Sequence, residues 1–390
     1  MFSKTPAIRS TRRGLWLALV ALMLTMVGGC ASLVPASTCT RDALAYVGSE
    51  EGRLVALRLD ACSGRLRSAG AVADVPRPRW AVSAPQGDML YVASDAPDQD
   101  GRVVAFKVDR ASGALQELNA QAAGGSGTTH LWLDAPSRTL FAANFGSGSV
   151  SSFALEADGR LGPLVSTLKA TGSGPHKRQS KAHAHGVVVD PSGHYVLAPD
   201  LGADRVFVYA FDRASRVLSS DTAQPPRAFA APAGSGPHHV AFGADGRFVY
   251  LLNELSADIT TLRWDAREGR LASVQLLPIS RADFNGAKSG AELAMSHDGR
   301  FVYVADRGTN ELLVYRVDAG TGELAPIQRL SSGGVAPWTF ALDPSGRWLL
   351  VVNARSNLVN LFGIDAASGQ LSDTGQSVAV PAPLSVTFIE

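Results

Sequence analysis

Cysteine is scarce in this chain, which has three in 390 residues. The three form no Cys-x-x-Cys pair and no Cys/His spacing typical of a zinc site. An excess of charge of one sign is also missing, because 36 Lys and Arg stand against 35 Asp and Glu, for a net charge of +1. With no basic surface, nucleic-acid binding is not expected.

Helical patterns are almost absent after residue 35, and the chain lacks several catalytic motifs. There is no Gly-x-Ser-x-Gly elbow, no His-Glu-x-x-His, no Walker loop and no complete Gly-x-Gly-x-x-Gly. These absences argue against serine-nucleophile hydrolysis and against a phosphate-cradling loop.

What the chain does have is a unit of 46 to 55 residues, written six times. The first strand of successive units is marked by Trp80, His130, His185, His239, Glu292, Trp338 and Ser385. Each unit has four short strands with turns such as Asp245-Gly246 after strand one and Thr321-Gly322 after strand three. A period of about 40–50 residues with four strands is typical of a β-propeller.

The two ends of the chain supply one more blade. Residues 384–389 read as an isolated first strand, and residues 44–75 read as three strands without a first. Joining them closes the ring and leaves no free sheet edge. The sequence therefore predicts an all-β fold, a single seven-bladed propeller over residues 44–390 with four-stranded antiparallel blades and one blade shared between the termini.

The first 29 residues are predicted to be a signal peptide. Arg9, Arg12 and Arg13 precede the apolar residues 14–29, a stretch too short for a confident membrane span. Residues 30–43 then form a tether to the propeller.

Residues 27–30, Val-Gly-Gly-Cys, resemble the bacterial lipoprotein cleavage box. That resemblance implies that Cys30 becomes the lipidated first residue of an exported protein, anchored in the cell envelope and facing the periplasm. Residues 11–15 resemble a twin-arginine export signal more weakly, and an ordinary secretory signal with Cys30 incidental is the alternative. An oxidising compartment would allow Cys39 and Cys62 to form a disulfide; the alternative is two unpaired buried cysteines.

Propeller geometry predicts where chemistry can occur. The links between strands two and three and the connections between blades share one face, and the ring brings them together at its axis. Polar residues gather in these segments: Asn144, Asp200, Asn253, Glu254, Arg307, Asn353 and Arg355 in the links, and His130, His183, His185, His238, His239, Glu292 and Trp338 at the blade entries. This clustering is the strongest functional signal in the sequence.

Each of these residues also has a structural interpretation. An Asn or Asp at a strand end, such as Asn144 or Asp200, often only caps a turn. The pair His183 and His185 would point to one face of a strand and is compatible with a metal, although no spaced carboxylate set supports one. Glu254 is either paired with an arginine or an acid/base group, and both can hold.

These residues resemble the bacterial β-propeller lactonase family, which includes propeller-type 6-phosphogluconolactonases and carboxymuconate-cyclising enzymes. The resemblance covers most of the chain after about residue 42. Its most specific stretches are residues 143–148, 172–175 leading through Arg178-Gln179 to 183–185, 199–205, 236–239 and 253–255.

The resemblance implies a lactone site made of a histidine, a glutamate and two arginines. Glu254 matches the glutamate, His185 or His183 the histidine, and Arg307 one arginine. His238 stands where the second arginine is expected, and a histidine cannot grip a carboxylate or phosphate with two parallel, permanently charged bonds. Substrate contacts are expected from His238, His239, His130, Asn253, Asp200, Asn144, Trp338 and Arg355.

The sequence thus predicts a hydrolase that opens a sugar or other small-molecule lactone by general acid/base catalysis, with neither metal nor cofactor. A strained ester is already reactive, so an activated water and a stabilised oxyanion suffice. Two alternatives are a non-catalytic envelope propeller that binds a ligand or partner on the same face, and a lyase or isomerase that opens or closes a lactone without water.

Overall fold

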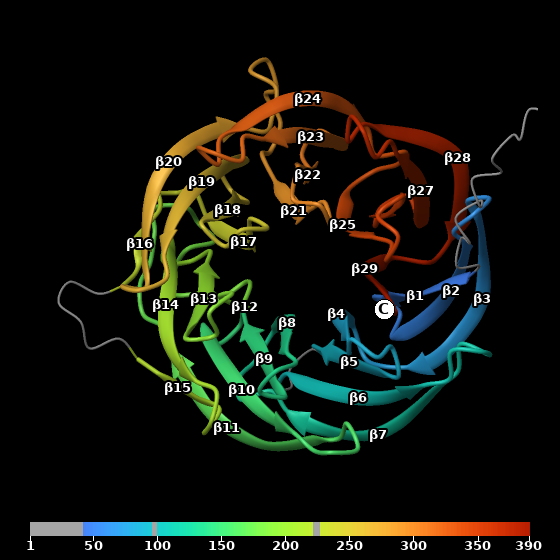
Figure 1. Cartoon of the computed structure of the whole chain (residues 1–390), viewed down its shortest axis with the longest axis horizontal. Coiled ribbons are helices and arrows are strands. Elements are labelled where there is room, and N and C mark those ends of the chain that lie inside the picture. Colours follow the sequence, from blue (N-terminus) through green and yellow to red (C-terminus); the bar gives the residue numbers. More distant parts are fainter. Residues whose placement is uncertain (1–41, 96–99, 221–226) are drawn as a thin grey trace, which may run out of the picture. The chain divides into compact units, whose positions relative to one another are not determined.

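The computed structural model describes residues 42–95, 100–220 and 227–390. The regular secondary structure of these ranges consists of strands alone, arranged as seven antiparallel sheets in a ring (Figure 1). Six sheets have four strands, and one has a short fifth strand beside its third. The predicted all-β, seven-bladed propeller is therefore confirmed.

The strands fall into four concentric positions (Figure 1). The innermost strands are β4 (Pro78–Ser83), β8 (Thr128–Asp134), β12 (Val188–Val189), β17 (Pro237–Phe242), β21 (Gly290–Met295), β25 (Pro337–Leu342) and β29 (Pro383–Phe388). The second strands are β1 (Asp42–Ser49), β5 (Met89–Ser94), β9 (Thr139–Asn144), β13 (Tyr195–Asp200), β18 (Phe248–Asn253), β22 (Phe301–Asp306) and β26 (Trp348–Asn353). The third strands are β2 (Arg53–Asp60), β6 (Arg102–Val108), β10 (Ser149–Leu155), β14 (Arg205–Asp212), β19 (Asp258–Asp265), β23 (Glu311–Val317) and β27 (Leu358–Ile364). The outer strands are β3 (Arg65–Asp74), β7 (Leu115–Ala122), β11 (Leu161–Lys169), β15 (Val217–Ser219), β20 (Arg270–Pro278), β24 (Leu324–Ser331) and β28 (Leu371–Ala379), with the extra β16 (Phe229–Ala230) on β14.

Both ends of the propeller build one blade, as predicted. Strand β29 pairs antiparallel with β1, from Ala45 opposite Phe388 to Gly48 opposite Ser385. Leu384 and Val386 of β29 are buried, so apolar contacts reinforce the ladder that joins the last strand to the first.

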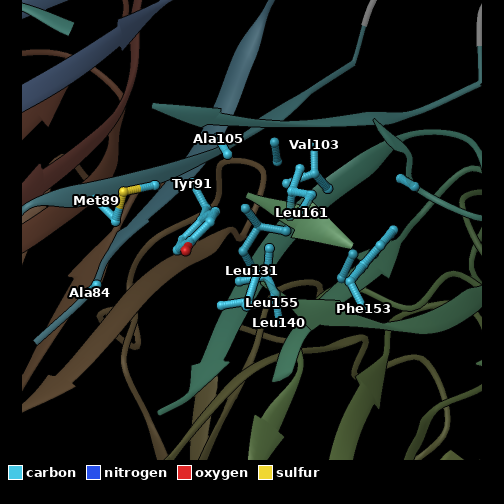
Figure 2. Close-up of a cluster of buried hydrophobic side chains, with 13 residues drawn as sticks. Ala84, Met89, Tyr91, Val103, Ala105, Leu131, Leu140, Phe153, Leu155 and Leu161 are labelled. Atoms are coloured by element: carbon cyan, nitrogen blue, oxygen red, sulfur yellow. The ribbon is translucent and has the colours of Figure 1, made fainter. Parts of the chain in front are cut away.

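The hydrophobic core lies between neighbouring blades. In one cluster, Tyr91 and Val103 of the second blade pack against Leu131, Leu140 and Phe153 of the third (Figure 2). Each such buried side chain contributes about 1.5–3 kcal/mol relative to exposure. Because every blade buries its faces against two neighbours, stability depends on the whole ring.

The glycine turns after the third strands also join blades. Gly322 has a φ of +76°, and a Cβ there would collide with the Phe248 ring of the preceding blade. The Tyr250 hydroxyl of that blade donates a hydrogen bond of 3.1 Å to the Gly322 carbonyl. The turn therefore requires glycine both for its backbone conformation and for its close contact.

The fourth blade departs from the regular pattern. Its innermost strand β12 has two residues, and an isolated bridge between Ala184 and Asp200 replaces the start of the ladder. His183 and His185 therefore lie in irregular chain before β12, rather than on the strand that the sequence suggested.

Residues 1–41 lie outside the described residues, and the predicted signal peptide, the lipid site Cys30 and Cys39 fall on them. Cys62 takes part in a disulfide bond, and its predicted pairing with Cys39 stays a prediction. Among the described residues, no helix is long and apolar enough to cross a membrane.

Candidate active site

A cavity of about 860 Å³ opens at the face where links and blade connections meet. Backbone hydrogen bonds join each link to the connection that enters the same blade, as between Glu254 N and Gly236 O at 2.8 Å and between Arg307 N and Ser289 O at 2.8 Å. The cavity is lined by residues 176–178, 286–289 and 335–336, by His185, Phe284 and Trp338, and by the links that follow β18, β22 and β26.

Glu254 lies at the centre of the polar wall, with 3% of its side chain exposed. Arg178 donates to both carboxylate oxygens, at 2.5 Å to Oε1 and 3.4 Å to Oε2. Arg307 Nη2 donates to Oε1 at 2.8 Å, and His238 Nε2 lies 3.7 Å from Oε2. A nearly buried carboxylate is thus held between two guanidinium groups and an imidazole.

Arg178 reaches Glu254 from the connection between β11 and β12. The side chain of the buried Gln179 donates to the Leu201 carbonyl at 2.8 Å and to Asp204 Oδ1 at 2.6 Å, which fixes this turn to the fourth blade. Asp204 also accepts the backbone N–H groups of Gly234 and Gly236 at 2.7 and 2.9 Å. One carboxylate therefore fastens both the connection that carries Arg178 and the connection that leads into β17, and with them the approach of Arg178 to Glu254.

Arg307 is placed by its position in the chain and by two side-chain contacts. It follows β22 directly, its Nε donates to Ser289 Oγ at 3.0 Å, and its guanidinium carbon lies 4.3 Å from the centre of the Trp338 ring. Burial lowers the pKa of Arg307 somewhat, and Glu254 opposes that shift by favouring the charged form.

A row of imidazoles leads inward from Glu254. The His185 and His238 ring centres are 3.6 Å apart, and His239 lies 4.3 Å from His238 and 4.9 Å from His130. Burial, reinforced by neighbouring positive groups, lowers the pKa of His185 and His238 well below the usual value, and burial does the same for His130. These three rings are therefore neutral at neutral pH.

The inner end of the row meets a second, more apolar cavity of about 500 Å³. Trp80, His130 and His239 line it, together with Glu292, whose Oε1 lies 2.8 Å from His239 Nδ1. The structure thus brings His185, His238, His239 and His130 together, as the sequence predicted. His130 and His239 line the second cavity, however, and not the cavity that holds Glu254.

Other predicted residues lie elsewhere. Asn144, Asp200 and Asn253 are buried and do not line the cavity. Asp200 accepts the N–H groups of His183 and Ala203, and the Asn144 and Asn253 amides bond to nearby hydroxyl, carbonyl and carboxylate groups. Asp200 has the geometry of a turn cap, which is the structural interpretation that the sequence left open for it. The Asn144 and Asn253 amides instead donate to oxygens of neighbouring segments, so their role in the structure is also to hold the links together.

His183 and His185 also separate. His183 stacks on Phe145, with ring centres 4.3 Å apart, and its Nδ1 lies 2.8 Å from the Phe145 carbonyl oxygen. His185 faces the cavity and His238. Of the two histidines that the resemblance offered, His185 is the one that lines the cavity beside Glu254. Trp338 and Arg355 line the cavity as expected.

Arg178 was missed as a site residue, and it changes the expectation built on His238. The second guanidinium beside Glu254 comes from the connection that carries Arg178, and not from the position of His238. The signal was present in the long connection between β11 and β12, whose Arg178-Gln179 pair is one of the specific stretches. Sequence spacing alone does not show which side chain of such a connection turns toward the axis.

Residues 36–388 match the family model described as lactonase, 7-bladed beta-propeller. The chain belongs to the seven-bladed β-propeller lactonase family. Two relatives named 6-phosphogluconolactonase come from Bacillus subtilis and Pectobacterium carotovorum. The first is 32% identical over 88% of this lactonase-family chain and 95% of its own length. The second is 28% identical over 70% of this chain and 78% of its own length.

The solved structure of the periplasmic gluconolactonase of Pseudomonas aeruginosa is also similar. It shares 34% identity with this lactonase-family chain, covers 90% of it and 99% of its own length, and superposes with a TM-score of 0.83. The family resemblance, the fold and the prediction of a lactonase-like enzyme are confirmed at the level of the family.

Proposed function

We propose that this protein hydrolyses a sugar lactone by general acid/base catalysis without a metal, in the cavity that holds Glu254. The observation that carries the proposal is the position of Glu254, held by Arg178 and Arg307 and facing the same cavity as His185. The family model and the relatives named 6-phosphogluconolactonase and gluconolactonase support a lactone as substrate.

In the proposed reaction, neutral His185 takes a proton from water as the water oxygen attacks the lactone carbonyl carbon. Negative charge develops on the carbonyl oxygen, where Arg178 and Arg307 stabilise it. The bond between the carbonyl carbon and the ring oxygen then breaks, and His185 returns the proton to that oxygen. The product is the open hydroxy acid. Glu254 positions both arginines and His238, which stacks on His185.

The charge of the cavity favours an anionic substrate. Lys177, Lys288 and Arg355 line it together with Arg178 and Arg307, and among the described residues that line it Glu254 supplies the one carboxylate. A phosphate or carboxylate on the sugar would meet this positive surface. The replacement of an expected arginine by His238 therefore does not argue against a phosphorylated lactone, because Arg178 supplies a second guanidinium.

A panel of lactones tests the proposal. The purified full-length protein is assayed with 6-phosphogluconolactone, gluconolactone and an aromatic lactone, each against its spontaneous hydrolysis. We expect acceleration of both sugar lactones, with kcat/KM about tenfold or more higher for the phosphorylated one. A preference for the uncharged sugar would overturn the charge argument only. No acceleration of any lactone, with a raised melting temperature in its presence, would show a binding protein instead.

We also propose that the protein is exported and lipid-anchored on Cys30, facing the periplasm. The residues before Cys30 and the likeness to a periplasmic gluconolactonase support this location. Incorporation of labelled palmitate by the wild type and its loss in Cys30→Ser would support it, whereas equal labelling would contradict it.

A further inference from the structure

We infer that His185, His238 and His239 form a binding site for one transition-metal ion of the Zn²⁺ class, at the inner end of the catalytic cavity. One ligand nitrogen from each ring lies within 4.8 Å of the others. Zinc accepts three histidines with water in the fourth position, and this set has that composition. The site goes beyond the proposed function, which uses no metal.

Each of the three rings has a free nitrogen. Within the described part of the chain, His185 Nδ1, His238 Nδ1 and His239 Nε2 are buried and have no hydrogen-bond partner. Burying an imidazole nitrogen without a partner is unfavourable, and three such atoms in one place indicate an unfilled role.

Glu292 gives His239 the environment of a metal ligand. Its Oε1 lies 2.8 Å from His239 Nδ1, so Nε2 is the ring nitrogen that remains to bind a metal. Metal-binding histidines usually donate their second nitrogen to a carboxylate in this way, because the bond fixes the tautomer and the direction of the ring. His183, by contrast, has its Nδ1 against the Phe145 carbonyl and stands outside the group.

The space around the three rings allows a cation, and the nearest guanidinium groups are each paired with a carboxylate. The three rings line a small cavity of about 60 Å³, which is room for an ion and a water molecule, since water occupies about 30 Å³. Arg79 also lines it but lies 3.5 Å from Asp95, and Arg307 is bound to Glu254. Bonds of about 2.0–2.1 Å to zinc require the rings to draw together by small rotations, mainly of the stacked His185 and His238.

A bound ion would affect the proposed reaction. It would take the lone pairs of His185 and His238, so Zn²⁺ should inhibit lactone hydrolysis. This consequence rests on the proposed function, whereas binding itself does not and is measured without substrate.

The test is a titration of the full-length protein with Co²⁺ after removal of metals with EDTA. We expect visible absorption bands of tetrahedral Co²⁺ that saturate at one equivalent and disappear when Zn²⁺ is added. His239→Gln should abolish them, and His183→Gln should leave them unchanged. Glu292→Gln should weaken binding about 10–100-fold, because the second bond to the ligand histidine is altered.

Thermal unfolding without metal shows whether each variant folds. If His239→Gln does not fold, the Co²⁺ affinity of Glu292→Gln alone tests the site. Absence of saturable binding would overturn the site. So would equal affinity in the wild type, His239→Gln and Glu292→Gln, since the metal would then be bound by other histidines such as the exposed His194.

Discussion

Glu254 works as part of a unit with Arg178 and Arg307, because its carboxylate engages both guanidinium groups. A lysine in place of Arg178 keeps the charge but loses the fork that reaches Oε1 and Oε2. We expect Arg178→Lys to lower kcat/KM for the best lactone about tenfold to 100-fold, as for loss of one donor to a developing oxyanion. Steady-state kinetics measure this change.

Lys177→Ala is the matched control for Arg178→Lys, because Lys177 is the neighbouring cation and also lines the cavity. It should raise KM for an anionic lactone while leaving kcat close to that of the wild type. Equal loss of kcat in the two variants would mean that Arg178 contributes only to the general charge of the cavity.

The buried imidazoles predict an unusual pH profile. An ordinary histidine base loses activity as pH falls through about 6.5. Since burial lowers the pKa of His185, its neutral form persists to lower pH, and the acid limb of kcat/KM should lie below that value. Rates measured between pH 4.5 and 7.5, after subtraction of spontaneous hydrolysis, test this. A half-maximal rate at pH 6.5 or above would contradict the assignment of His185 as the base.

At the scale of the elements, short glycine turns hold neighbouring blades together. We expect Gly322→Ala to lower the free energy of unfolding by about 2–3 kcal/mol, because it adds a collision with Phe248 to the strain of a positive φ. Gly375→Ala is a matched control: its φ is +69° but no atom of the described residues lies within 4 Å of the new Cβ, so only about 1 kcal/mol should be lost. Chemical denaturation measures both, and equal losses would remove the packing argument.

The elements also show what the sequence could predict. The strand period and the Asp-Gly turns were sufficient to place all seven blades, because a repeat constrains each unit to pack on the next. The break in the pattern at β12 was not predicted, because His183 and His185 match the strand entries of the other units. Arg178 was missed for a related reason: its direction depends on the buried Gln179 and Asp204, which are tertiary contacts rather than a local pattern.

For the whole molecule, β29 closes the ring. A chain that ends at Ala382 lacks this strand, so β1 keeps β2 but loses its inner neighbour, and the buried side chains Leu384, Val386 and Phe388 are lost. At about 1.5–3 kcal/mol for each side chain, the lost burial free energy is a large part of the free energy of unfolding of a typical protein. We expect a large drop in melting temperature and aggregation through the free edge.

A chain that ends at Ile389 keeps β29 and is the control for this truncation. It should unfold close to the wild-type temperature and remain soluble. Comparable stability of both shortened chains, by thermal unfolding and size-exclusion chromatography, would show that the shared blade is not needed to close the ring.

Glu254 is the centre of the proposed lactone-hydrolysing site. The most direct measurement is kcat/KM for the best lactone with the wild type and with Glu254→Gln, both shown to be folded by thermal unfolding. The glutamine has the same shape but no charge to hold Arg178 and Arg307, so the rate should fall about 100-fold or more. Equal rates for the two proteins would contradict the account.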